Sequence, residues 1–184
     1  MKANKGYVPA DGEVTSEERA LLESVSVDGK FVDSPNGRIV NPGHSLEAAW
    51  FILAEGIITK NDEAIAAAKN IIEITLPLGI DKEHFGIIAF TDISGKPPVQ
   101  LEWDMKLWWV HNEALIATLV AYKITGDEKY SAWYDKLHDY IFSHFSDPDG
   151  YLPAEASSDG VHLTREYYLV WSDYLKSHTI TEVE

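Results

Sequence analysis

The sequence contains no cysteine, which excludes a disulfide framework and any site built on a thiolate. A chain without cysteine fits a reducing compartment, so we expect a cytoplasmic protein. Basic residues are also scarce: 15 Lys and Arg stand against 30 Asp and Glu, and the formal net charge is -15. Such a surface repels phosphate backbones and anionic lipid, so we expect neither nucleic acid nor a membrane as a partner.

The sequence also lacks a long uninterrupted hydrophobic run. Its most apolar stretch, residues 107–122, is interrupted by His111, Asn112 and Glu113, which predicts a buried helix rather than a membrane span. The first 19 residues lack the apolar segment of a signal peptide. What the chain does have is 45% hydrophobic residues over 184 positions, which suits one packed domain.

Periodicity and turn signals predict a mostly helical chain. Helices are expected at 15–25, 44–57, 61–76, 104–124, 127–145 and 164–177. Short extended pieces are expected at 30–32 and 38–40. The segment 85–98, with Ser94-Gly95 at its turn, predicts a small β-hairpin in a loop.

Two segments of the chain resemble each other. One begins "HSLEAAWFILAEG" and the other "HNEALIATLVAYK", and each continues through a turn into a second amphipathic helix. The period is roughly 65 residues, longer than that of the common solenoid repeats. A repeated helix pair favours an all-α toroid of helical hairpins, with one ring of helices facing a central cavity and the other facing solvent.

The first candidate site follows the Pro42-Gly43 turn. His44 opens a helix there, and Glu47 and Trp50 follow on the same face. This stripe combines a base, a carboxylate that can hold the imidazole, and a flat apolar platform. The structural alternative is that His44 and Glu47 only cap the helix.

The second candidate site is "LEWDMKLWWVHNEAL", residues 101–115. On the predicted helix, Asp104, Trp108 and His111 share a face, flanked by Lys106, Trp109 and Glu113. Tryptophans among ionisable groups are typical of sugar sites, where indole faces stack on ring C–H groups and charged groups bind hydroxyls. The alternative is that the tryptophans belong to the core. No histidine pair has metal-ligand spacing, so we expect no metal.

Two stretches of the sequence, "DGKFVDSPNGRIVNPGHSLEAAWF" and "QLEWDMKLWWVHNEALIATLVAYKITGD", resemble the N-acylglucosamine 2-epimerase family, which includes the renin-binding proteins. The resemblance covers residues 27 to about 148. It implies part of an (α/α) toroid, a sugar substrate, and epimerisation at C2 of an aldose or N-acetylhexosamine, with no cofactor.

The resemblance also implies roles for individual residues. The histidine of the family's P-G-H motif is one of two acid/base residues and corresponds to His44, with Glu47 one turn on. The residues that line the same pocket correspond to Glu102, Asp104, Lys106, Trp108, Trp109, His111 and Glu113. The family's second acid/base histidine lies in a K-G-x-F-H-x-P-R segment without a counterpart here. We therefore expect the second base to be His111 or a residue of a partner chain.

Residues 1–26 and 149–184 do not match the family's motifs, and we expect residues 1–184 to form a single half-toroid domain. An open apolar edge with Ile52, Ile57 and Leu119 predicts a homodimer that closes the ring. One alternative is a non-catalytic sugar- or partner-binding helical module, or a truncated or engineered toroid fragment. A glycoside hydrolase or lyase on the same toroid is a further alternative, which would need an acid pair around the sugar.

Overall fold

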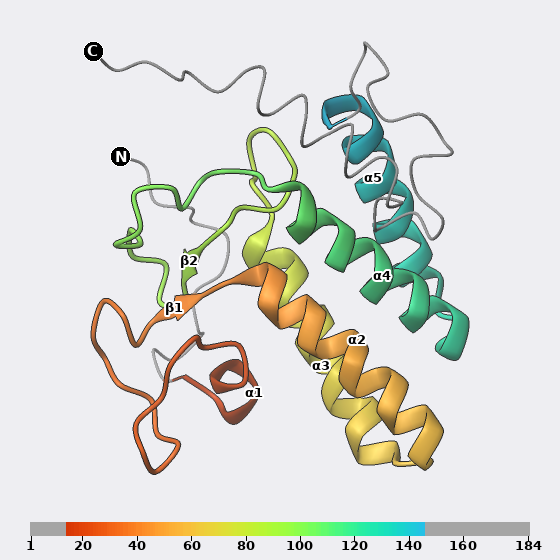
Figure 1. The fold of residues 1–184 in the computed structure, drawn as a ribbon, viewed down its shortest axis with the longest axis horizontal. Coiled ribbons are helices and arrows are strands. Elements are labelled where there is room, and N and C mark those ends of the chain that lie inside the picture. Colours follow the sequence, from red (N-terminus) through yellow and green to blue (C-terminus); the bar gives the residue numbers. More distant parts are fainter. Residues whose placement is uncertain (1–13, 146–184) are drawn as a thin grey trace, which may run out of the picture. The chain divides into compact units, whose positions relative to one another are not determined.

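The computed structural model describes residues 14–145, and the helix predicted at 164–177 lies outside them. The described residues are mostly helical, with one small sheet, which confirms the predicted all-α class (Figure 1). In chain order the elements are α1 (Ser16–Arg19), β1 (Ile39–Val40), α2 (Pro42–Thr59), α3 (Asp62–Gly79), β2 (Thr91–Asp92), α4 (Trp108–Thr125) and α5 (Glu128–His144).

The four long helices form two hairpins. Helix α2 packs against α3 and also against α4, and α4 packs against α5. Helices α2 and α4 run side by side in the same direction, while α3 and α5 run back (Figure 1). Two helical hairpins are predicted from the internal repeat, with α2 and α4 as the equivalent helices. In the structure the N-terminal ends of these two helices meet.

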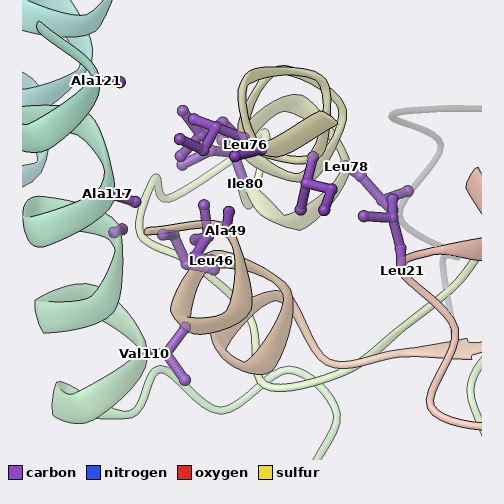
Figure 2. Close-up of a cluster of buried hydrophobic side chains, with 14 of the residues drawn as sticks. Leu21, Leu46, Ala49, Leu76, Leu78, Ile80, Val110, Ala117 and Ala121 are labelled. Atoms are coloured by element: carbon purple, nitrogen blue, oxygen red, sulfur yellow. The ribbon is translucent and has the colours of Figure 1, made fainter. Parts of the chain in front are cut away.

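The core lies between the helices. Leu46 and Ala49 of α2 and Leu76 of α3 are buried together with Ala117 and Ala121 of α4 (Figure 2). Alanine also occupies the buried position 114, so α4 presents a face of small side chains at helical spacing. Small side chains let neighbouring helix backbones approach closely, which allows α4 to pack against α2 along this face.

Helix α2 begins two residues before the predicted start. Asn41 is its N-cap, and the side-chain oxygen accepts hydrogen bonds from the backbone N–H of Gly43 (3.0 Å) and of His44 (3.2 Å). Pro42 occupies the first helical position, where a missing N–H costs nothing. The cap and the proline together fix His44 in the first turn of the helix.

The predicted end of α3 at Leu76 is wrong. Asn61 caps the helix as expected, but the helix continues through Pro77 to Gly79. Pro77 lacks the N–H that would bond to the Glu73 carbonyl, and its ring crowds that carbonyl, so it favours an earlier end. Leu78 and Gly79 are buried, and Gly79 packs closely against Pro42 at the start of α2. Packing of the last helical turn therefore outweighs the tendency of Pro77 to end the helix.

The predicted start of α4 at Asp104 is also wrong, because the helix begins at Trp108. The carbonyls of Trp103 and Met105 accept hydrogen bonds from the N–H groups of Phe90 (3.1 Å) and Ala89 (2.9 Å). Those carbonyls therefore form hydrogen bonds to the preceding loop rather than within a helical turn. The segment 101–104 forms turns instead of a helix.

The predicted β-hairpin within 85–98 is wrong as well. Strand β2 pairs antiparallel with β1, with Ile39 opposite Asp92 and Val40 opposite Thr91. The expected turn does form, since the Gly95 N–H bonds to the Asp92 carbonyl at 2.9 Å. The partner strand, however, comes from the extended piece predicted at 38–40. Of the two predicted extended pieces, only this one forms a strand.

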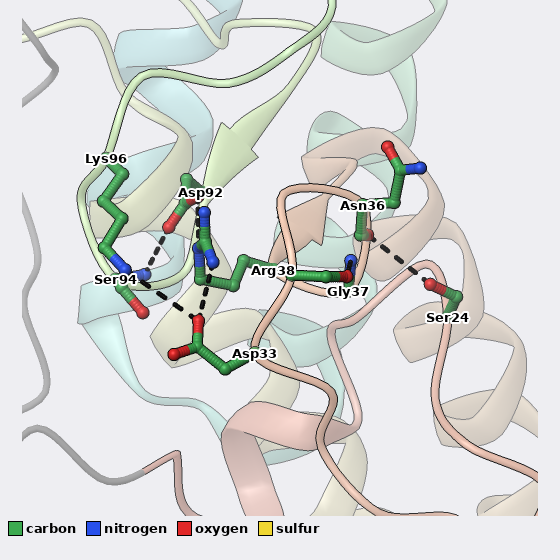
Figure 3. Close-up of polar contacts among 9 residues, drawn as sticks. Ser24, Asp33, Asn36, Gly37, Arg38, Asp92, Ser94 and Lys96 are labelled. Carbon is green, nitrogen blue, oxygen red and sulfur yellow. Dashed lines mark hydrogen bonds and ion pairs between the residues drawn. The ribbon is translucent and has the colours of Figure 1, made fainter.

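A buried arginine ties this sheet to the loop before it (Figure 3). The Arg38 Nε donates to an Asp92 oxygen at 2.9 Å, and its Nη1 donates to Asp33 at 2.6 Å. The other Asp92 oxygen accepts from the backbone N–H of Ser94 at 2.8 Å. Because Arg38 lies four residues before helix α2, this ion-pair network anchors the segment that leads into the helix.

Candidate functional site

His44 lies in the first turn of α2 with its imidazole half exposed (55%). Its Nδ1 lies 3.1 and 3.2 Å from the two carboxylate oxygens of Glu23. On its other side the imidazole faces the indole of Trp109 in α4, with ring centroids 5.5 Å apart and tilted by 35°. The predicted base is therefore accessible and held from two directions.

Glu23 comes from a part of the chain that the sequence motifs did not single out. The motif spacing favoured Glu47 as the residue that holds His44, and Glu47 is half-buried one turn along the same helix. The contact to Nδ1 is made by Glu23, which lies 21 residues before His44. A spacing argument within one helix cannot find such a partner, because it reaches the histidine from another segment.

A second contact joins α2 to α4 further along the two helices. The Trp50 Nε1 donates a hydrogen bond of 2.7 Å to a carboxylate oxygen of Glu113. The Trp50 indole also stacks on Phe51, with ring centroids 3.9 Å apart. The two stretches singled out from the sequence thus meet in space along the same pair of helices.

Gly43 allows Trp109 to lie beside His44. A Cβ added at Gly43 would come within 2.6 Å of the Trp109 ring and within 2.9 Å of Val110. Any larger residue would push the indole away from the start of α2. The glycine of the Pro-Gly pair is therefore required for close packing between the two helices.

His111 lies in a different environment from His44. It is completely buried, its Nε2 accepts the Ile87 N–H at 2.9 Å, and its Nδ1 lies 2.7 Å from the Leu107 carbonyl. Burial lowers the pKa of His111, and the nearby charge of Lys106 acts in the same direction. The ring is therefore neutral, and both its nitrogens are bonded to backbone groups. This geometry connects the loop before α4 to the helix and does not present a ring nitrogen beside His44.

Lys106 forms an ion pair with Asp81 in the loop that follows α3. Burial tends to raise the pKa of the Asp81 carboxyl, but the Lys106 ammonium and the N–H groups of Glu83 and His84 outweigh it, so the pKa is lowered. The Lys106 ammonium lies close enough to His111 to lower its pKa. Lys106 thus fastens the loop that also carries Ile87.

The remaining predicted residues lie before or at the start of α4. Glu102 and Asp104 are exposed in the turns that precede the helix, and Trp108 is 58% exposed. Asp104 does not share a helical face with Trp108, because α4 begins at Trp108. Of the site residues predicted in the second stretch, Trp109 and Glu113 contact side chains of α2.

Within residues 14–145, no three His, Asp or Glu side chains are grouped so that they could hold a metal ion. In the same part of the chain, no helix has the length and apolar character needed to cross a membrane.

Comparison with known proteins supports the assignment by motif. The sequence pattern of the N-acylglucosamine 2-epimerase (GlcNAc 2-epimerase) family matches residues 8–153, reaching beyond the 27–148 expected from the motifs. The N-acylglucosamine 2-epimerase of Mus musculus is 42% identical over 158 residues, which are 81% of this chain and 36% of the mouse protein. The chain thus spans about a third of the length of the curated relatives it matches.

Two solved structures share the fold. The crystal structure of a D-mannose isomerase matches with a TM-score of 0.56 and 26% identity, over 66% of this chain and 30% of that one. The cellobiose 2-epimerase of Bacillus thermoamylovorans B4167 matches with a TM-score of 0.51 and 24% identity, over 60% of this chain and 27% of that one. The likeness in fold and the family pattern over residues 8–153 lead to one conclusion: the chain belongs to the N-acylglucosamine 2-epimerase family.

Proposed function

We propose that this chain carries part of a sugar 2-epimerase site, in which His44 transfers a proton at C2 of an aldose or N-acetylhexosamine. The observation that carries the proposal is the half-exposed imidazole of His44, held by Glu23 and packed beside Trp109. The names of the relatives, an N-acylglucosamine 2-epimerase and a D-mannose isomerase, favour hexose substrates.

The chemistry explains why these residue types lie together. Opening of the sugar ring exposes an aldehyde, which acidifies the proton on C2. A neutral imidazole can remove that proton, and a second group must return one on the opposite face for the configuration to invert. The Trp109 indole offers a flat apolar surface to sugar C–H groups, and the Glu113 carboxylate offers oxygens to sugar hydroxyls.

The second proton-transfer group is proposed to come from outside residues 14–145 of this chain. Both ring nitrogens of His111 are bonded to backbone groups, so its geometry does not favour that role. We propose a homodimer in which a second copy completes the ring, because Ile52, Ile57 and Leu119 are exposed on the helices that carry the site. We also propose a cytoplasmic location, which is the location expected from the absence of cysteine.

A non-catalytic sugar-binding module is the second candidate. The observation in its favour is that, of the two predicted proton-transfer histidines, only His44 is accessible. A site with one base could bind sugar and exchange the C2 proton without inverting the configuration.

The deciding experiment is incubation of the full chain with N-acetylmannosamine in D₂O, followed by NMR at C2. Deuterium incorporation together with the epimer supports an epimerase, and incorporation without the epimer indicates one working base. Binding detected by tryptophan fluorescence with no incorporation supports the binding module instead.

His44→Gln should reduce incorporation on the order of 10²–10⁴-fold, because it removes a proton-transfer group. His138→Gln is a matched control, since His138 is also a half-exposed helical histidine beside a carboxylate. Incorporation that is equally fast in His44→Gln and in the unmodified chain would remove His44 from the mechanism.

A further inference from the structure

We propose that Glu23 is the positioning residue of His44, and that it holds the ring in the tautomer with a proton on Nδ1 and a free lone pair on Nε2. The effect on proton transfer rests on the proposed function, whereas the tautomer itself follows from the contact. Both carboxylate oxygens of Glu23 lie within 3.2 Å of Nδ1. An ionised carboxylate can only accept, so Nδ1 must donate, and in a neutral imidazole Nε2 is then unprotonated.

The position of Glu23 is set by backbone hydrogen bonds rather than by a flexible surface contact. The Glu23 N–H donates to the Ile39 carbonyl at 2.9 Å, and the adjacent Leu22 forms an antiparallel bridge with Val40. Strand β1 therefore carries Glu23 on one side and continues directly into the cap of α2. Both partners are tied to the same short segment, because Asn41 fixes the backbone of His44.

The contact also differs from the other histidine–carboxylate pairs in the described part of the chain. His84 lies 3.9 Å from Glu83, and His138 lies 3.7 Å from Asp139; both pairs join adjacent residues with exposed carboxylates. The Glu23–His44 pair joins segments 21 residues apart, is closer at 3.1 Å, and has a carboxylate that is only 32% exposed. Tertiary structure, rather than sequence adjacency, produces it.

Trp109 completes the support of the ring. Its indole faces the imidazole, while Glu23 holds the Nδ1 atom. With Nδ1 occupied, Nε2 is the nitrogen of His44 that can accept a proton from a substrate. Glu23 thus selects Nε2 as the reactive atom of His44.

The first test measures the tautomer directly, by ¹⁵N NMR of the ring nitrogens in the full-length chain above neutral pH. His44 signals are identified by their loss in His44→Gln. We expect a protonated Nδ1 and an unprotonated Nε2 in the unmodified chain and in Glu23→Gln, whose amide oxygen still accepts. Glu23→Ala should lose this preference, whereas Glu83→Ala, the control beside His84, should leave the His44 signals unchanged.

A protonated Nε2 in the unmodified chain, or the same ring signals in Glu23→Ala with a native amide spectrum, would overturn the inference. The amide spectrum separates this result from a failure to fold.

The second test measures C2 deuterium incorporation. Glu23→Ala should lower kcat roughly 10–100-fold, as the loss of a group that orients a functional histidine does in metal sites. The KM for sugar should change little, and Glu23→Gln should recover part of the rate. An unchanged kcat in Glu23→Ala contradicts the positioning role. If the unmodified chain shows no incorporation, the proposed function fails, and the tautomer measurement alone decides the inference.

Discussion

His44 and His111 show how surroundings divide one residue type between two roles. His44 starts α2 with an exposed ring and a carboxylate on Nδ1, so a proton can be exchanged at its other nitrogen. His111 lies on the buried face of α4, where Ile87 and Leu107 take both ring nitrogens. The sequence predicted functional histidines at both positions. It could not predict their exposure, because burial of His111 depends on distant segments, the loop that carries Ile87 and Tyr140 of α5, whose ring stacks on the imidazole.

The environment of His111 predicts how stability depends on pH. Burial lowers its pKa in the folded state below the ordinary value of 6.5, so below that pH the unfolded chain binds a proton that the folded chain does not. The stabilising contribution is therefore complete above about pH 6.5 and is lost as the pH falls. We expect the free energy of unfolding, measured in urea, to decrease between pH 7.5 and 5.5.

Substitutions separate the contribution of His111 to the pH dependence of stability from the contributions of the other histidines. His111→Gln should show a flatter pH dependence and should be about 1–3 kcal/mol less stable at pH 7.5, where the Ile87 N–H loses its acceptor. His138→Gln, at a half-exposed site, should keep the slope of the unmodified chain. An identical slope in His111→Gln would mean that this histidine does not contribute to acid destabilisation.

At the scale of elements, α2 and α4 end in the same way with different residues. Helix α2 is closed by Lys60 with φ of 53°, and α4 is closed by Gly126 with φ of 67°. Glycine adopts this left-handed conformation without a steric penalty, whereas lysine does not. In both helices the cap N–H reaches back to a carbonyl of the last turn.

This pair of caps predicts opposite effects of substitution. Lys60→Gly should stabilise the protein by about 0.5–1 kcal/mol, because it relieves the strained φ of Lys60. Gly126→Ala should destabilise it by about 1–2 kcal/mol, since an added Cβ meets no atom within 4 Å and only the backbone conformation is penalised. Thermal and urea denaturation measure both changes, and a shift in the same direction for the two variants would contradict the argument.

The sequence predicted an element's ends well or poorly depending on whether local residues or distant contacts determine them. The starts of α3 and α5 were predicted well from their capping residues, Asn61 and Asp127, whereas the start of α2, which Asn41 caps, was predicted two residues too late. The start of α4 was missed because distant contacts decide it, as at Met105, whose carbonyl is bonded to Ala89. The same distinction applies to the site. The motifs located His44 and the Trp109 region, but Glu23 reaches His44 through strand pairing that no local pattern reveals.

At the scale of the molecule, the helices that carry the site also carry exposed apolar side chains. Phe51, Ile52, Ile57 and Ile58 of α2 and Leu119 of α4 are all at least about one third exposed, and Ile58 reaches 78%. Exposed apolar surface of this kind favours association.

We therefore expect the protein to self-associate at micromolar concentration in sedimentation velocity. Ile58→Glu should shift the distribution toward monomer, because it places a charge among these apolar side chains. Val27→Glu is the matched control, since Val27 is fully exposed in the loop before β1 and should not affect association. A single monomeric species for the unmodified chain would rule out the homodimer.

The division of the site between α2 and α4 also determines when it assembles. Each hairpin closes through a short turn, at Lys60–Asn61 and at Gly126–Asp127, so its contacts are local and form quickly. The hydrogen bond from Trp50 to Glu113 instead joins residues 63 positions apart, across a whole helix and a long loop. We therefore expect the helices to form before the hairpins dock, so that a newly synthesised chain acquires its helices before it acquires the surface that we propose binds a sugar.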